Sequence, residues 1–163
     1  MLETNYTRVG DNKLLVEREF DSSVEQVWKA WTETDILDQW WAPLPFKAVT
    51  VKMDFNPGGQ WLYYMEGPDG ARHYCTVTYD TIEPNRSFSG DDGFCDENGN
   101  INKDFPVMKW NVGFAAAGSR TKVDVEITFN SEDDLNKIVE MGFKEGFRMA
   151  HENLDRILQK QPA

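Results

Sequence analysis

The stretch that decides the fold is TKVDVEITFNSEDDLNKIVEMGFKEGFRMAHENLDRILQ, residues 121–159. Polar and apolar residues alternate over its first nine positions, which predicts a strand with one buried face. Ser131 then occupies an N-cap position, and Asp134 follows three residues later, as in a capping box with Asp in place of Glu. The apolar residues beyond this cap recur at helical spacing to about Gln159: Leu135, Ile138, Val139, Phe143, Phe147, Ala150, Leu154, Ile157 and Leu158. The stretch therefore predicts a half-buried strand followed by one long amphipathic helix.

Near its start, the chain predicts another strand and two short helices. Residues 13–20, KLLVEREF, alternate between apolar and polar side chains, as a half-buried strand does. The next segment, DSSVEQVWKAWT, predicts a helix capped by Ser22 or Ser23. DILDQWWAP predicts a second helix, which Asp35 caps and which stops before Pro43 because proline restricts the residue that precedes it.

Short strands and tight turns fill the middle of the chain. AVTVKMDF places Val49, Val51, Met53 and Phe55 on one predicted face. GPDG predicts the turn of a hairpin between two strands rich in aromatic residues. RSFSG predicts a short strand that leads into a polar loop, and PVMKWNVGFA predicts the partner of the last strand.

This order of elements predicts an α+β fold in a single domain. An antiparallel sheet with one apolar face needs a cover, and the long C-terminal helix supplies one. We expect a curved antiparallel sheet of six to seven strands wrapped around that helix, with two short helices after the first strand. The domain is expected to span residues 1–163 with a core at about 13–160.

Composition narrows the classes of function. The chain is 40% hydrophobic and 13% aromatic, which is typical of a folded globule. Its net charge of −11 argues against nucleic acid and membrane surfaces as partners. The first residues lack a basic-then-apolar signal pattern, so we expect a cytoplasmic protein. Cys75 and Cys95 lack metal-binding spacing and are expected to be free thiols, and we expect no metal and no cofactor.

Six segments spread along the chain carry a family resemblance. They are REF (18–20), VWKAWTETDILDQWWAP (27–43), DFNPGGQW (54–61), MEGPDG (65–70), IEPNR (82–86) and GFKEGF with NLDRIL (142–158). Together they resemble the activator of Hsp-90 ATPase homologue family, within the START-like superfamily of the birch-pollen-allergen helix-grip fold. The chain departs from the family pattern at Ser22-Ser23, where Ala-Pro is usual, at Asn56, where Arg is usual, and near Thr76 to Thr78, where a Gly is usual.

The resemblance implies three functions, between which fold alone does not choose. The first is a binding module for a small hydrophobic or aromatic ligand held in an internal cavity. The second is an interaction domain whose partner is a heat-shock ATPase. The third is an enzyme of cyclase or hydrolase type, which the sequence favours less. A monomer and a homodimer are both open, and Trp40 or Trp41 would mark a dimer face if exposed.

Two motifs that resemble anion or metal sites are better explained as turns and loops. Gly58 and Gly59 precede a strand rather than a helix and have no lysine close by, so they predict a hairpin corner and not a phosphate loop. The acidic loop at 90–104 has alternating Asp and Asn, but its glycine is Gly99 and the position of the bidentate glutamate is Val107. We interpret it as a solvated loop that can act as a lid.

Thirteen residues are candidates to line the ligand cavity. Gly142 and Gly146 lie four apart on the predicted helix, where each glycine costs about 1 kcal/mol relative to alanine, so they suggest that space is needed there. The flanking helix residues and the inward residues of the sheet complete the set: Trp61, Tyr63, Met65, His73, Cys75, Val77, Met108, Trp110, Phe143, Phe147 and Arg18.

Few polar groups are candidates for chemistry. His73 and His151 are the only histidines, and either can serve as a general acid or base, although a lone histidine is more often structural. Arg18 shares the strand parity of the apolar residues and is expected at the cavity edge, paired with a carboxylate or a ligand anion. No residue is assigned a catalytic role.

Overall fold

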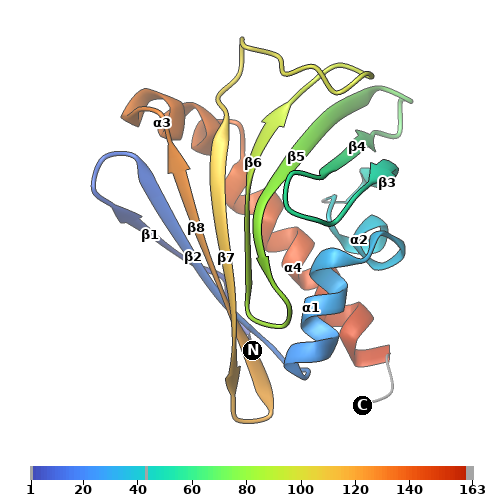
Figure 1. Cartoon of the computed structure of the whole chain (residues 1–163), viewed down its shortest axis with the longest axis vertical. Helices are drawn as coiled ribbons and strands as arrows, with labels where there is room; N and C mark the ends of the chain where they lie inside the picture. Colours follow the sequence, from blue (N-terminus) through green and yellow to red (C-terminus); the bar gives the residue numbers. More distant parts are fainter. Residues whose placement is uncertain (1, 43, 161–163) are drawn as a thin grey trace.

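The computed structural model describes residues 2–42 and 44–160. Pro43, where the sequence predicts the end of the second helix, lies outside the described residues. Eight antiparallel strands form one sheet in the order β1-β2-β8-β7-β6-β5-β4-β3 (Figure 1). The strands are β1 (Asn5–Val9), β2 (Lys13–Phe20), β3 (Lys47–Met53), β4 (Gln60–Glu66), β5 (Arg72–Glu83), β6 (Ser87–Phe94), β7 (Met108–Ala117) and β8 (Arg120–Phe129).

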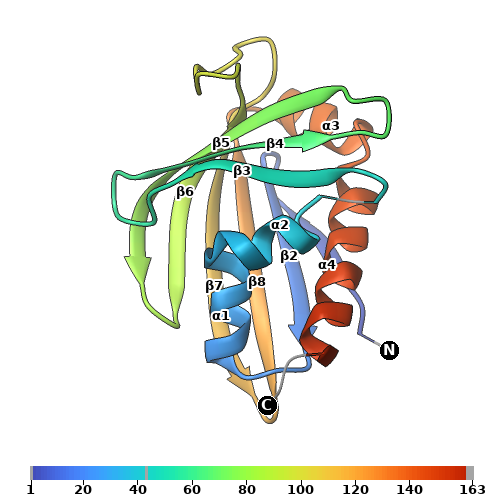
Figure 2. The ribbon, with the colours of Figure 1, turned by 90° about the vertical axis from the view of Figure 1, so that its right-hand side faces the viewer.

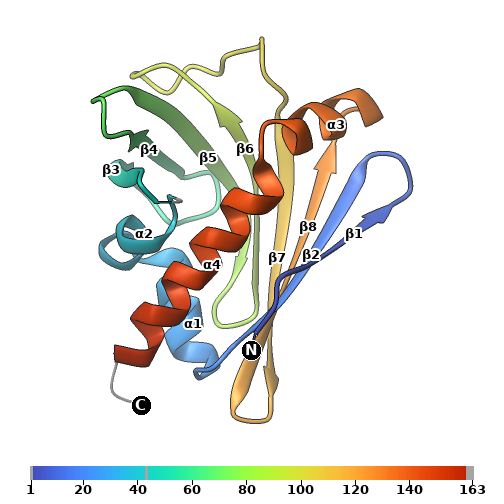
Figure 3. The same cartoon turned by 180° about the vertical axis from the view of Figure 1, so that it is seen from behind.

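The sheet curves around the C-terminal helix, as the helix-grip expectation requires. Figure 2 shows β3, β4 and β5 bending over the top of the helices, while β7 and β8 run nearly vertically. The helices are α1 (Val24–Thr32), α2 (Thr34–Trp40), α3 (Glu132–Glu140) and α4 (Phe143–Lys160). From behind, α4 crosses the concave face of the sheet diagonally (Figure 3). The α+β helix-grip prediction is therefore confirmed.

The sheet has one strand more than predicted, because β1 has no sequence signal. Four of the five β1 residues are exposed, so no alternation of apolar and polar side chains marks it. It pairs with β2 from Asn5 opposite Glu17 to Val9 opposite Lys13. The two short helices consequently follow the second strand of the chain and not the first.

Local capping signals are confirmed at two of three helices. The Ser23 hydroxyl accepts from Gln26 N at 3.3 Å, and the Ser131 hydroxyl accepts from Asp134 N at 3.1 Å. The predicted Asp35 cap is wrong, because α2 begins two residues earlier, at Thr34, with Glu33 at the N-cap and no side-chain capping bond. Asp35 lies instead in the first turn, where a negative charge still suits the helix dipole.

The C-terminal helix is divided in two, which the apolar spacing did not reveal. α3 ends at Glu140 and α4 starts at Phe143, and Gly142 between them has a φ of +93°. Only glycine adopts such a φ without strain. The prediction that Gly142 lies inside a continuous helix was therefore wrong, and its conformation rather than its size explains the residue.

Two mid-chain predictions also need correction. A β-bulge between Thr50 and Lys52 shifts the register of β3, so Val51 points outward and is 53% exposed, whereas Phe55 packs on the core as predicted. The predicted loop at 90–104 starts too early, because β6 continues to Phe94.

The Pro-Gly-Gly corner is a turn, as predicted. Gly58 has a φ of +82°, and a Cβ on Gly59 would lie 2.1 Å from the backbone oxygen of Asp54. The Gly58 N–H donates to Tyr79 O at 2.8 Å, and the Gly59 N–H donates to Asn56 O at 2.7 Å. Both amides are thus used within the chain, so the corner offers no free N–H pair to a phosphate.

An aromatic core fills the space below the curve of the sheet. Trp31 lies at its centre, with ring contacts to Trp40 at 5.0 Å and to Phe114 at 6.1 Å. Trp40 is fully buried and donates from Nε1 to Ala30 O at 2.9 Å, and Trp41 also packs on the core. Neither tryptophan is exposed, so the condition under which they would mark a dimer face is not met. Within the described part of the chain, no helix is long and apolar enough to cross a membrane.

Candidate ligand-binding cavity

A cavity of about 350 Å³ lies between the α3–α4 region and the inner face of β4, β5, β6 and β7. Most of the residues predicted to surround such a cavity line it: Tyr63, Met65, His73, Cys75, Met108, Trp110, Gly142, Phe143, Gly146 and Phe147. Sequence reasoning missed the rest of the lining: Trp41, Phe46, Asp92, Gly93, Phe94, Ile138 and Met141.

Two glycines form part of the cavity wall. Gly142 closes the break between α3 and α4, and the Gly146 N–H donates to its carbonyl at 3.0 Å, which begins the α4 hydrogen-bond pattern. A Cβ built on Gly142 meets no atom within 4 Å. The wall here is backbone, so the helix leaves room that a larger side chain would occupy.

Aromatic rings make up the wall around these glycines. Phe143 and Phe147, one turn apart on α4, stack with ring centroids 5.3 Å apart. Trp110 on β7 meets Phe147 edge to face at 5.6 Å, and Trp41 lies 6.0 Å from both Trp110 and Phe147. Such a wall presents both ring faces and ring edges to a bound molecule.

Tyr63 supplies a polar group on the sheet side. Its ring stacks on Trp61 at 4.1 Å, and its hydroxyl accepts a 2.8 Å hydrogen bond from Trp41 Nε1. Burial, followed by the neighbouring Cys75, raises the pKa of Tyr63 well above its ordinary value. Burial also raises the pKa of the Cys75 thiol, so both groups are neutral hydrogen-bonding groups at neutral pH.

Asp92 is the one acidic residue of the lining. It lies on β6, opposite Val77 on β5 and Met108 on β7, and is 9% exposed. Burial raises the pKa of Asp92 to about 7, against the lowering effect of a hydrogen bond from the backbone of Gly93. The sequence did contain a signal, because Phe88, Gly90, Asp92 and Phe94 share one strand parity within SFSGDDGF.

The cavity opens to the surface at its rim. His73, at the start of β5, and Met141, before the α3–α4 break, both line the cavity and are exposed. The His73 ring lies 6.2 Å from the ring of Phe46, which follows α2. The lining therefore reaches the surface between the start of β5 and the helix break.

Two predicted residues, Trp61 and Val77, line a smaller neighbouring cavity of about 30 Å³. This cavity shares Trp41, Asp92 and Trp110 with the large one. Asp92 therefore lies where the two spaces meet.

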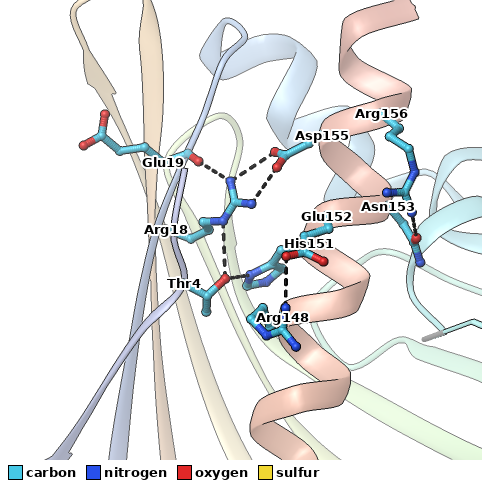
Figure 4. Close-up of polar contacts among 9 residues, drawn as sticks. All are labelled: Thr4, Arg18, Glu19, Arg148, His151, Glu152, Asn153, Asp155 and Arg156. Atoms are coloured by element: carbon cyan, nitrogen blue, oxygen red, sulfur yellow. Dashed lines mark hydrogen bonds and ion pairs between the residues drawn. The ribbon is translucent and has the colours of Figure 1, made fainter. Parts of the chain in front are cut away.

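Arg18 does not line the cavity, and its predicted place there was wrong. It lies on β2, which β8 separates from β7, the nearest strand of the cavity wall, and is 3% exposed. Its guanidinium donates to both carboxylate oxygens of Asp155 on α4 at 3.0 and 2.6 Å, to Glu19 O at 2.8 Å and to the Thr4 hydroxyl at 3.3 Å (Figure 4). The predictions that the Arg18 side chain points inward and pairs with a carboxylate were correct, but the ion pair holds the fold together and does not belong to the cavity.

His151 belongs to the same polar cluster. Its Nδ1 lies 3.0 Å from the Thr4 hydroxyl (Figure 4). Its ring lies 4.1 Å from that of Phe147. Burial, with a smaller contribution from Arg18, lowers its pKa well below the ordinary value. A buried neutral imidazole bound to a hydroxyl suits the structural role that we expected for a lone histidine.

The regularly spaced Asp and Asn residues of the acidic loop form hydrogen bonds with one another. Asp96 Oδ1 accepts from the backbone N–H groups of Asn98 and Asn100, each at 2.9 Å. These bonds and the Asn100 side chain lower the pKa of Asp96. Among the described residues, no group of three or more His, Cys, Asp or Glu could hold a metal ion. A lid role for this loop stays a prediction.

Comparison with known proteins identifies the family. The family model for Activator of Hsp90 ATPase homolog 1-like protein matches residues 21–159. An NMR structure of an Arthrobacter aurescens protein is 32% identical, with a TM-score of 0.89 over 96% of this chain and 92% of that one. A crystal structure of protein Ms6760 from Mycobacterium smegmatis is 28% identical in sequence, with a TM-score of 0.89 over 99% of each chain. CalU16 from Micromonospora echinospora, 16% identical over 98% of this chain and 86% of that one with a TM-score of 0.61, shares the fold alone. The comparison with curated proteins gave no match. The chain belongs to the Activator of Hsp90 ATPase homolog 1-like family.

Proposed function

We propose that this protein binds a small hydrophobic or aromatic molecule in the cavity between its sheet and α4. The cavity itself carries the proposal, because its volume of about 350 Å³ falls within the range typical of small-molecule sites. Its wall is mainly aromatic and apolar, and the polar groups are few and spaced: Asp92, Tyr63, Cys75 and His73. Such a lining buries an apolar body and leaves a small number of groups to orient it.

The other two interpretations from sequence depend on different features. The enzyme interpretation requires His73 or Arg18 to line the cavity beside a second polar group. Arg18 is committed to Asp155, and His73 lies at the exposed rim against the ring of Phe46. Binding to a heat-shock ATPase remains a prediction that a pull-down with the purified protein would test.

Binding can be tested with a neutral aromatic probe, N-phenyl-1-naphthylamine, whose fluorescence rises in apolar surroundings. We expect the wild-type protein to bind it with energy transfer from the cavity tryptophans. Gly146→Leu fills the wall of the cavity, and Glu145→Leu adds the same side chain at the adjacent exposed position. Gly146→Leu should weaken binding by about tenfold or more, whereas Glu145→Leu should leave it unchanged.

The absence of probe binding to the wild type, or equal binding by both variants, would contradict the proposal. Native mass spectrometry of the protein purified from its host would then show whether any small molecule travels with it. A molecule that is retained by the wild type and lost from Gly146→Leu would identify the physiological ligand.

A further inference from the structure

Asp92 is a buried carboxyl group without a cationic partner. It is 9% exposed, and it forms no ion pair with any residue in the described part of the chain. A carboxylate away from water is costly unless it is paired, and the fold gives this one only a backbone hydrogen bond from Gly93. Arg18 differs, because its buried charge is paired with Asp155. The carboxyl group of Asp92 has no such partner, so it does not stabilise the fold.

The groups facing Asp92 are neutral or aromatic. From β4 and β5 these are Tyr63, Cys75 and Tyr79, whose pKa values are all raised by burial, so none of them carries a charge at neutral pH. From β7 they are Met108 and Trp110, while Trp41 and Phe147 contribute rings from the helical side. Cys95, which directly follows β6, has a pKa raised to about 11 by burial. His73 at the rim is the only other titratable group in the lining besides these.

The wall and the overall charge both favour a cation. Trp41, Trp110 and Phe147 line the cavity, and the π-face of an aromatic ring attracts an ammonium group. No lysine or arginine occurs among the described lining residues, and the chain carries a net charge of −11. The resulting negative potential repels carboxylate ligands such as fatty acids and draws in organic cations.

We propose that the ligand of this cavity is an apolar amine, whose protonated nitrogen donates hydrogen bonds to the Asp92 carboxylate while its apolar body packs on the aromatic wall of Trp110, Phe143 and Phe147. The inference rests on the proposed function, because it names the class of molecule that the cavity holds. Charge-assisted hydrogen bonds and a cation beside aromatic faces are the two interactions that distinguish an amine from a neutral molecule of the same shape.

Proton release accompanies binding in this arrangement. The empty cavity holds Asp92 partly protonated near neutral pH, since burial raises its pKa to about 7. A bound ammonium favours the carboxylate, so the carboxyl group gives its proton to solvent when the amine enters. Amine affinity should therefore rise with pH up to about 7.

A matched pair of probes tests the inference: 1-naphthylmethylamine, a cation at neutral pH, and 1-naphthylmethanol, its neutral analogue. The variant Asp92→Asn removes the carboxylate, and Asp91→Asn makes the same charge change at the adjacent exposed position of β6. In wild-type protein the amine should bind about tenfold tighter than the alcohol. Asp92→Asn should remove that preference with little change in alcohol binding, and Asp91→Asn should leave both affinities unchanged.

The outcomes separate the inference from the proposed function. Equal binding of amine and alcohol, or an amine preference that survives Asp92→Asn, overturns the amine assignment and leaves the cavity as a site for neutral aromatic molecules. Failure of both compounds together with N-phenyl-1-naphthylamine overturns both proposals. If Asp92→Asn does not fold, calorimetry of ligand binding to the wild type at pH 6, in two buffers of different ionisation enthalpy, still tests the inference. Binding of the amine should release protons, and binding of the alcohol should release none. Equal proton release on binding of either compound contradicts the inference.

Discussion

Arg18 and Asp155 join the sheet to the C-terminal half of α4 through two parallel hydrogen bonds, at 3.0 and 2.6 Å, although the residues lie 137 positions apart. The Arg18 side chain is 2% exposed, and that of Asp155 is 23% exposed. The other end of α4 begins at Phe143, beside the cavity rim. One end of the helix is thus fixed by an ion pair, and the other borders the space where a ligand would enter.

Removal of Asp155 should therefore destabilise the protein strongly. Asp155→Ala leaves the buried Arg18 guanidinium with the Glu19 carbonyl and the Thr4 hydroxyl as its hydrogen-bond partners and with no carboxylate. Loss of one member of a buried pair costs several kcal/mol, and the partial exposure of Asp155 reduces this to about 2–3 kcal/mol. Urea unfolding measures the loss. The control is Glu152→Ala on the same helix, which breaks an exposed pair with Arg148 and should cost less than about 1 kcal/mol. Equal losses in the two variants would contradict the structural role of Arg18.

Gly142 should resist substitution because of its backbone and not because of crowding. Its φ of +93° strains any side chain, although a Cβ would meet nothing within 4 Å. Gly142→Ala should therefore cost about 1–2 kcal/mol in thermal or urea unfolding. Gly113 on β7 provides the control, since it has no positive φ and equal free space, so Gly113→Ala should be nearly neutral. A harmless Gly142→Ala would mean that α3 and α4 can join into one helix.

Asp92 should make the stability of the unliganded protein depend on pH. Its pKa is raised from 3.8 to about 7 by burial, so between these values the folded state holds a proton that the unfolded chain has released. Stability from this group is complete below pH 4, falls as the pH rises, and is lost above about 7, a change on the order of 4 kcal/mol.

The comparison with Asp92→Asn isolates this effect. The free energy of unfolding of Asp92→Asn minus that of the wild type should increase from pH 4 to pH 7 and then level off. The same difference for Asp91→Asn should stay nearly flat. A flat difference for Asp92→Asn as well would show that Asp92 is ionised in the folded protein throughout this range.

The two cysteines should report cavity occupancy. Cys75 lines the cavity, whereas Cys95 does not, and burial raises the pKa of both, that of Cys95 to about 11. Methyl methanethiosulfonate should therefore modify Cys95 slowly and Cys75 more slowly still, because the thiolate is the reactive form. Bound N-phenyl-1-naphthylamine should slow Cys75 further and leave Cys95 unchanged, as followed by peptide mass spectrometry. Equal protection of both thiols would indicate a general stiffening instead of occupancy.

Sequence reasoning succeeded where a signal and its consequence lie close together in the chain. The alternation in TKVDVEITF predicted the buried face of β8, and Ser131 predicted the start of α3. It failed where a single residue changed the pattern. The bulge at Val51 interrupted the alternation of β3, and Gly142 ended a helix whose apolar spacing continued beyond it.

The candidate site shows the same division. Inward parity located Tyr63, Cys75 and Trp110, because strand geometry assigns alternate residues to one face. The same parity placed Arg18 inward but did not show that β2 lies outside the cavity strands. Asp92 was missed because two consecutive aspartates are typical of a loop. In the structure β6 extends through both of them, so the side chain of Asp92 points toward the core.

The sequence by itself determined the class of fold, the starts of α1 and α3 and the hairpin corners, because hydrophobic period, capping and glycine conformation depend on residues only a few positions apart. Tertiary structure alone decided which part of the inner face is packed and which is hollow, which carboxylate neutralises Arg18, and that Asp92 is left without a partner. These features depend on the curvature of the sheet and on contacts between distant segments, and burial in that setting fixes the charge state of the groups that face the cavity.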